Sequence, residues 1–216
     1  AFLDGFLELA DKHAVSLVGG DTTRGPLSIS VTAMGLLETG NALRRDRAQV
    51  GDDIWVTGTL GDAAAALEAV LTGAQTSTWL RARLDRPTPR IDAGRRLSGL
   101  ANSCIDLSDG LLADLGHLCE RSAVGAEIEL GNLPMSVDLA ALDPSGRSRW
   151  QACGGDDYEL CFSASPRNRE SIVQALDFTD VCATRIGRIV AGQGVRAFGA
   201  DGNEWIPSRR GYQHFP

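Results

Sequence analysis

The stretch CIDLSDGLLADLGHLCE, residues 104–120, places several carboxylates where a strand-like segment gives way to a helix. The residues just before it, 103–107, are short and partly apolar, as at the end of a strand. Apolar residues then recur at the spacing of one helix face, at Leu111, Leu112, Leu115, Leu118 and Cys119. We therefore predict a strand, an acidic turn and a helix, with Ser108 or Asp109 capping the first helical turn.

The acidic turn of residues 106–110 contains more negative charge than a helix cap requires. On the simplest interpretation, Asp109 is only a cap and Asp106 only a turn residue. A cap uses one side chain, however, so the second carboxylate calls for another partner. Mg²⁺ prefers oxygen ligands and usually shares them with substrate phosphates, which makes a hard cation the candidate.

Strand-like and helical segments intermix along the rest of the chain without a strict βαβ alternation. This pattern favours an α+β fold, with helices packed on a mixed or antiparallel sheet, over a doubly wound parallel sheet. We predict a closing hairpin near residues 201–203. The other predicted strands are residues 14–18, 27–37, 54–57, 126–130, 158–164 and 182–190, and the other predicted helices are residues 2–13, 62–73, 85–100 and 167–176.

Two further turns combine glycines with carboxylates, GGDTTRG at residues 19–25 and GGDDYEL at residues 154–160. Each alone has a simple explanation: Asp21 making a local turn bond, and Asp156 and Asp157 being solvated turn residues. Three such turns in one chain favour a site where metal ions bridge carboxylates to phosphate oxygens.

Composition limits the function classes. The 216 residues carry a net charge of −7 and no basic cluster, which argues against a nucleic-acid partner. No apolar run reaches membrane-spanning length, and five scattered cysteines fit a reducing cytoplasm. Lys12 is the one lysine beside 20 arginines, so the lysine-containing phosphate loop is absent and a phosphorylated ligand would meet arginine, backbone N–H groups and metal ions.

The chain resembles the thiamine-monophosphate kinases, within the ATP-binding superfamily that includes aminoimidazole ribonucleotide synthetase and selenophosphate synthetase. The similarity runs nearly from end to end. Its motifs are LVGGDTTRGPLS (17–28), ALRRDRAQVGD (42–52), VTGTLGDAAAAL (56–67), RPTPRI (86–91), ANSCIDLSDGLLADLGHL (101–118), GGDDYELCF (154–162) and GYQHF (211–215).

The resemblance implies ATP-dependent phosphorylation of thiamine monophosphate to thiamine diphosphate, by direct in-line transfer assisted by Mg²⁺. It implies no phosphoenzyme and therefore no covalent catalytic residue. By position, the implied metal ligands are Asp21, Asp106 and Asp109, and the implied ATP contacts are Gly20, Asp21, Arg45 and Ser108. Arg44 and Arg47 are close enough to Arg45 in sequence to leave that choice open.

The implied substrate contacts are Asp156 and Tyr212. The family usually has glutamate where this chain has Asp156, so this contact is expected to be longer or bridged by water. The Tyr212 ring is placed to stack on thiamine, and its alternative role is a packed carboxy-terminal anchor.

The resemblance also implies a two-domain architecture with most of the amino-terminal domain absent. Residues 1–45 would be the remnant of that ATP-binding, metal-binding and dimerisation domain, and residues 46–216 the carboxy-terminal α+β domain. A cytoplasmic homodimer formed through the amino-terminal domain is expected, and the 216-residue fragment alone is expected to be inactive. The alternatives are a non-catalytic nucleotide-binding fragment and a superfamily relative acting on another phosphoacceptor.

Overall fold

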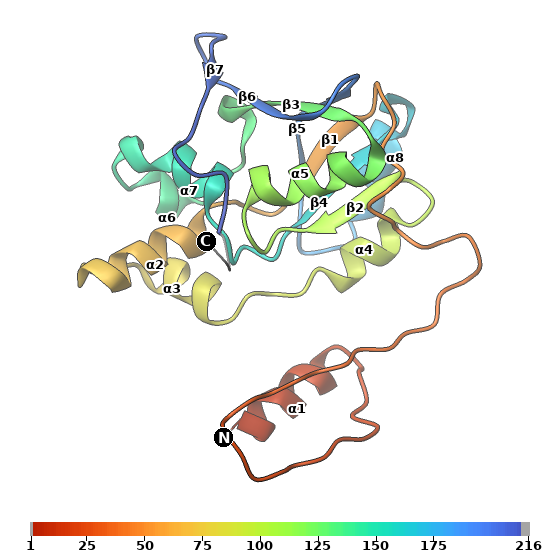
Figure 1. Ribbon diagram of the computed structural model, residues 1–216, viewed down its shortest axis with the longest axis vertical. Helices are drawn as coiled ribbons and strands as arrows, with labels where there is room; N and C mark the ends of the chain where they lie inside the picture. Colours follow the sequence, from red (N-terminus) through yellow and green to blue (C-terminus); the bar gives the residue numbers. More distant parts are fainter. Residues whose placement is uncertain (1, 213–216) are drawn as a thin grey trace. The chain divides into compact units, whose positions relative to one another are not determined.

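The computed structural model describes residues 2–212 of the chain (Figure 1). The chain divides into two compact units between Thr39 and Gly40, and each unit has its own internal structure. The boundary near Arg45 that the resemblance implies refers to the domains of the family and stays a prediction.

The amino-terminal unit contains one helix, α1 (Phe2–Lys12), as predicted. The strands predicted at residues 14–18 and 27–37 are wrong, because the described chain forms no strand between residues 13 and 38. The alternating pattern is present in the sequence, yet its apolar members Leu27, Val31 and Met34 are exposed. A strand needs a neighbouring strand to satisfy its backbone groups, and this segment pairs with none.

The carboxy-terminal unit is built on one seven-stranded sheet with the order β2-β4-β1-β5-β3-β6-β7. Neighbouring strands are antiparallel, except that β3 and β6 run parallel. The predicted α+β fold with a mixed sheet is therefore confirmed. The strands are β1 (Asp53–Thr57), β2 (Ser103–Asp106), β3 (Gly125–Glu129), β4 (Leu160–Ala164), β5 (Ala183–Val190), β6 (Gly194–Phe198) and β7 (Glu204–Trp205).

Helices cover the sheet on its two faces (Figure 1). The α-helices of this unit are α2 (Asp62–Thr72), α3 (Thr78–Asp85), α4 (Ile91–Leu97), α5 (Leu111–Ser122), α6 (Val137–Ala140), α7 (Arg147–Cys153) and α8 (Arg169–Leu176). Short 3-10 turns span Leu130–Asn132, Pro144–Gly146 and Pro166–Asn168. The sequence did not predict α3, whose N-cap Ser77 accepts the Leu80 N–H at 3.1 Å.

The central strand β1 is buried on both faces and separates two apolar cores. Ile54 and Val56 belong to the core beneath α5, together with Leu115. Trp55 faces the other way, toward α4 and α8, and stacks on Phe162 with ring centroids 6.2 Å apart. Burial of apolar surface, which contributes about 25 cal/mol per Å², is the main force that holds such layers together. It holds β2 and β4 in the sheet.

None of the helices within residues 2–212 has the length and apolar character needed to cross a bilayer.

Candidate functional site

The acidic turn connects β2 to α5, as predicted, but its internal support differs from the prediction. Gly110 is the N-cap of α5, and no side chain caps the helix from that position, so the predicted cap by Ser108 or Asp109 is wrong. Instead Asp114, one turn into the helix, reaches back. Its Oδ2 accepts the backbone N–H groups of Ser108, Asp109 and Gly110 at 3.0, 3.0 and 3.1 Å.

Asp114 therefore shapes the turn from below while staying buried itself. Burial raises the pKa of its carboxyl group, and the three N–H donors act against that rise. The sequence analysis missed this residue. The sequence feature that could have identified it is an acidic residue in the first turn of the helix. Such a side chain can accept hydrogen bonds from preceding N–H groups, as in a capping box.

The loop of residues 154–160 lies alongside the acidic turn and continues the pairing of β2 with β4. The Leu107 N–H donates to the Glu159 carbonyl at 2.8 Å, and the Tyr158 N–H donates back to the Leu107 carbonyl at 2.9 Å. The Asp156 N–H donates to the Ser108 carbonyl at 2.9 Å. A Cβ at Gly155 would lie 2.4 Å from that same carbonyl oxygen, so this close approach requires glycine.

The carboxy-terminal segment joins the same place. The Tyr212 N–H donates to the Asp109 carbonyl at 2.9 Å. A Cβ at the preceding Gly211 would meet that carbonyl oxygen at 2.7 Å, which accounts for the glycine before the tyrosine. Three motifs that are far apart in the sequence thus converge on one turn.

The convergence gathers the predicted residues of the carboxy-terminal unit into one surface, which we call the acidic patch: Asp106, Ser108, Asp109, Asp156 and Tyr212. The Tyr158 side chain lies among its carboxylates. Burial is the largest cause that raises the pKa of the Tyr158 phenol, and the negative charges of Asp156, Asp106 and Asp109 add to it. Tyr158 and Asp106 are exposed, and Asp109 and Asp156 are half-buried.

Arg45 lies at the edge of the acidic patch. Its Nη2 is 3.3 Å from Asp106 Oδ1, and both side chains are about half exposed. Arg44, which the sequence left as an alternative, instead pairs with Asp46, with Nε 2.7 Å from Oδ1. On the Arg45 side an open cavity of about 620 Å³ is lined by Arg45, His117, Glu120 and Arg121, and its basic members are suited to phosphate groups.

Gly20 and Asp21 belong to the amino-terminal unit. Both are exposed, and Asp21 Oδ1 accepts the N–H of Thr22 at 2.8 Å. This bond is to the next residue, whereas the Asx turn considered as the alternative to metal binding would bond two residues on.

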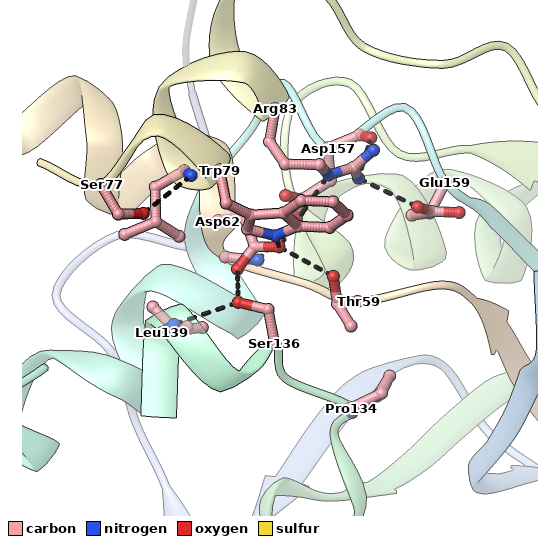
Figure 2. A network of polar contacts seen from close by, with 12 residues as sticks. Thr59, Asp62, Ser77, Trp79, Arg83, Pro134, Ser136, Leu139, Asp157 and Glu159 are labelled. Carbon is pink, nitrogen blue, oxygen red and sulfur yellow. Dashed lines mark hydrogen bonds and ion pairs between the residues drawn. The ribbon is translucent and has the colours of Figure 1, made fainter. Parts of the chain in front are cut away.

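Behind the loop of residues 154–160 lies a buried polar network that the sequence did not predict (Figure 2). Its carboxylates are Asp62, Asp157 and Glu159, all nearly inaccessible to solvent. The Glu159 carboxylate accepts from Thr57 Oγ1 at 2.7 Å, from Arg83 Nη2 at 2.9 Å and from Arg90 Nε at 2.7 Å. The interpretation of Asp157 as a solvated turn residue is wrong, since it is 2% exposed.

Asp62 and Asp157 complete the network. Asp62 accepts from Ser136 Oγ at 2.6 Å, Thr59 Oγ1 at 2.8 Å and Trp79 Nε1 at 3.2 Å, and these three donors surround it in Figure 2. Asp157 Oδ2 accepts the Gly61 N–H at 2.9 Å, while its Oδ1 has no hydrogen-bond partner among the described residues. Burial raises the pKa of the Asp157 carboxyl group from 3.8 to about 8, so this group holds a proton at neutral pH.

The substitution Asp157→Asn should remove a pH dependence of stability. The unfolded chain releases the Asp157 proton near pH 3.8, whereas the folded chain keeps it up to about pH 8. The folded state therefore binds more protons in this window, and the free energy of unfolding of the wild type falls as pH rises through it. We expect the variant to lack this fall and to be the more stable protein at pH 8, as measured by urea denaturation at several pH values.

Asp53→Asn is the control with the opposite sign. Asp53 is also buried, but hydrogen bonds from Arg169 lower the pKa of its carboxyl group, and Arg185 contributes further. Its charge therefore stabilises the fold above the unfolded pKa, and the variant should lose stability at neutral pH. Parallel stability curves for the wild type and Asp157→Asn would contradict a protonated Asp157.

Comparison with known proteins identifies the family of this chain. Residues 49–199 match the family described as AIR synthase related protein, C-terminal domain. Thiamine-monophosphate kinase of Escherichia coli strain K12 is 42% identical over 221 residues, an alignment that spans all of this chain and 68% of the relative.

Two solved structures extend the comparison. The crystal structure of thiamine-monophosphate kinase from Stenotrophomonas maltophilia K279a superimposes with a TM-score of 0.86 at 50% identity, covering 94% of this chain and 67% of that one. A structure described as AaThiL complexed with AMPPCP and TMP superimposes with a TM-score of 0.65 at 35% identity, covering 80% of this chain and 54% of that one. By sequence and by fold, this chain belongs to the thiamine-monophosphate kinase family.

Proposed function

We propose that the protein phosphorylates thiamine monophosphate to thiamine diphosphate with ATP, by direct in-line transfer and with Mg²⁺. The observation that carries this proposal is the acidic patch. Asp106, Ser108, Asp109, Asp156 and Tyr212 come from three separate motifs and are joined by backbone hydrogen bonds. The relative described as complexed with AMPPCP and TMP supports the choice of substrates.

The donor set of the acidic patch fits Mg²⁺. Within residues 2–212, no three carboxylate, imidazole or thiol groups form a ready cage for a metal ion. Mg²⁺ does not need one, because it keeps several waters and binds through one or two carboxylates plus substrate phosphates. Asp106 and Asp109 supply two carboxylates from one turn, and the resemblance adds Asp21 as a third proposed ligand.

Phosphoryl transfer of this kind depends on positioning and on charge neutralisation. Mg²⁺, when bound, would neutralise phosphate oxygens and help align the transferred group. By the resemblance, Arg45 and the hydroxyl of Ser108 would contact the ATP phosphates, and Gly20 and Asp21 are the other proposed ATP contacts. Asp156 would attract the cationic thiazolium ring of the acceptor.

The direct test is product formation. The 216-residue chain alone is expected to be inactive, so the assay uses a protein of the full length of the relatives, of which this chain covers 68%, with the chain alone beside it. Each is incubated with ATP, Mg²⁺ and either thiamine monophosphate, thiamine or an unrelated phosphomonoester. Thiamine diphosphate is measured by fluorescence after oxidation, and ADP release reports transfer to any of the acceptors. We expect product only when thiamine monophosphate is the acceptor, and none when EDTA removes the metal. Transfer to a different phosphomonoester would instead support a relative with another acceptor. ATP binding without any transfer would support the non-catalytic alternative.

The substitution Tyr212→Ala should weaken thiamine monophosphate binding and leave ATP binding little changed. The Tyr212 side chain is 65% exposed, and its backbone N–H, which holds the segment on Asp109, survives the substitution. Loss of a stacked aromatic ring should raise the KM for thiamine monophosphate about tenfold. Steady-state kinetics with each substrate varied in turn provide the measurement.

Two results would contradict this role of Tyr212. If both KM values rise together with a fall in thermal stability, Tyr212 is a structural anchor. If neither KM changes, the ring does not contact the substrate. Tyr212→Phe is the matched control, since it keeps the aromatic ring and should stay close to the wild type.

Two further proposals rest on the resemblance to the family. The active protein would be a homodimer formed through the amino-terminal domain, and it would act in the cytoplasm, where ATP is available. Sedimentation velocity of the active preparation tests the first proposal, and cell fractionation tests the second.

A further inference from the structure

Asp156 and Tyr158 both have left-handed backbone conformations, with φ of 66° and 49°. This region is unfavourable for residues other than glycine, and least suitable for a bulky side chain such as tyrosine. Such conformations persist only where the surrounding structure imposes them. Contacts from the surrounding structure must therefore hold the backbone of residues 156–158 in place. The residues that make these contacts need not touch the substrate themselves.

The side chains of this segment alternate between the two environments. Asp156 and Tyr158 face the acidic patch, whereas Asp157 and Glu159 are 2% and 0% exposed and face the buried network. Contacts from α3 and the loop before α4 reach this segment through the Asp157 carbonyl oxygen and the Glu159 carboxylate.

One donor in the network has contacts on both sides of Tyr158. Arg83 Nη2 lies 3.0 Å from the Asp157 carbonyl oxygen and 2.9 Å from Glu159 Oε1. Figure 2 shows the Arg83 side chain reaching from α3 toward Asp157 and Glu159. Arg83 itself is 7% exposed, so these contacts are shielded from water. Charged hydrogen bonds are stronger in the protein interior than in water.

Arg90 offers a natural comparison within the same network. It contacts the same Glu159 carboxylate, with Nε 2.7 Å from Oε2 and Nη2 2.5 Å from Oε1. No contact between Arg90 and the Asp157 carbonyl is described. Arg83 also pairs with Asp62, with Nε 3.9 Å from Oδ2. The two arginines therefore share the pairing with Glu159 and differ in the bridge across Tyr158 and in this longer ion pair.

We propose that Arg83 is a positioning residue for thiamine monophosphate: by bridging the Asp157 carbonyl and the Glu159 carboxylate, it holds the segment that presents Asp156 and Tyr158 to the substrate. This inference rests on the proposed function and adds a residue that does not touch the substrate. A small displacement of a binding group far from the reacting atoms is enough to change kinetics by orders of magnitude. The effect should fall on the acceptor, because Arg83 supports the loop of residues 154–160.

The test compares Arg83→Gln with Arg90→Gln. Each variant removes one guanidinium from Glu159, so the loss of positive charge beside this carboxylate is the same, and the stability of each variant is measured beside its kinetics. We expect Arg83→Gln to raise the KM for thiamine monophosphate at least tenfold with the KM for ATP within twofold of the wild type. Arg90→Gln should leave both KM values within about threefold. Arg83→Lys and Arg90→Lys repeat the comparison with milder substitutions, because they keep the positive charge. The KM of Arg83→Lys for thiamine monophosphate should lie between those of the wild type and Arg83→Gln.

The kinetics are measured on protein shown to be folded by circular dichroism. Equal effects of the two arginines, or a joint rise of both KM values, would overturn the positioning role. Failure of both Arg83 variants to fold while the Arg90 variants fold would assign Arg83 to the stability of the fold, and would also overturn it. A wild-type protein of the relatives' full length that forms no thiamine diphosphate would refute the proposed function itself, which separates that failure from this one.

Discussion

Asp106→Asn should reduce the rate of thiamine diphosphate formation by a hundredfold or more without unfolding the protein. The side chain of Asp106 is half exposed and ends β2 beside the acidic turn, so the amide fits the same space. What changes is charge, because a proposed Mg²⁺ ligand is lost, along with the ion pair to Arg45. A loss of several kcal/mol in transition-state stabilisation corresponds to about a hundredfold or more in rate. The measurement is the turnover number at saturating ATP and thiamine monophosphate.

Asp180→Asn is the matched control for this prediction. Asp180 is also exposed but lies in the loop before β5, so its variant should keep wild-type turnover. Near-normal turnover of Asp106→Asn at saturating Mg²⁺ would mean that Asp106 is only a turn residue, which is the alternative that the sequence left open.

Gly58→Ala should destabilise the fold by more than about 3 kcal/mol, among the larger effects seen for single substitutions. Gly58 follows β1 with φ of 60°, which is unfavourable for alanine by about 1–2 kcal/mol. The added Cβ would also lie 2.2 Å from Glu159 Oε1. That carboxylate is held by Arg83 and Arg90 and has no room to withdraw. Chemical denaturation monitored by tryptophan fluorescence provides the measurement.

Gly73→Ala separates the two causes. Gly73 ends α2 with a similar φ of 70°, yet an added Cβ there would meet nothing within 4 Å. The free energy of unfolding of this variant should fall only by the contribution of the unfavourable backbone conformation, about 1 kcal/mol. Equal losses of stability in the two variants would show that the buried network rearranges around the added methyl group. That result would contradict the proposal that this network holds residues 156–158 rigidly.

The acidic turn and the sheet around it could be predicted from sequence because their signals are local. Helical spacing after Gly110 and the short strand-like patterns of β1, β3 and β5 are decided within a few residues. The prediction failed where a partner decides the outcome. Residues 27–37 alternate like a strand, but alternation specifies only which face would be buried, and no neighbouring strand is present to bury it.

The supporting residues of the site were missed for a related reason. Asp157 was interpreted as a solvated acid in a glycine-rich turn and Glu159 as part of a strand, and both contact arginines some 70 residues earlier in the chain. Such pairing over a long sequence distance leaves no periodic pattern. In contrast, the residues proposed for the site lie in recognisable motifs. The resemblance named Asp106, Ser108, Asp109 and Asp156, and the structure brings the segments that contain them together.

The central claim is that the acidic patch holds the metal that serves phosphoryl transfer. Anomalous diffraction from crystals grown with Mn²⁺, a non-hydrolysable ATP analogue and thiamine monophosphate tests it directly. We predict an anomalous peak about 2.0–2.5 Å from a carboxylate oxygen of Asp106 or Asp109 and from a phosphate oxygen of the nucleotide. Mn²⁺ bound only to the nucleotide, with both carboxylates turned to solvent, would contradict the claim.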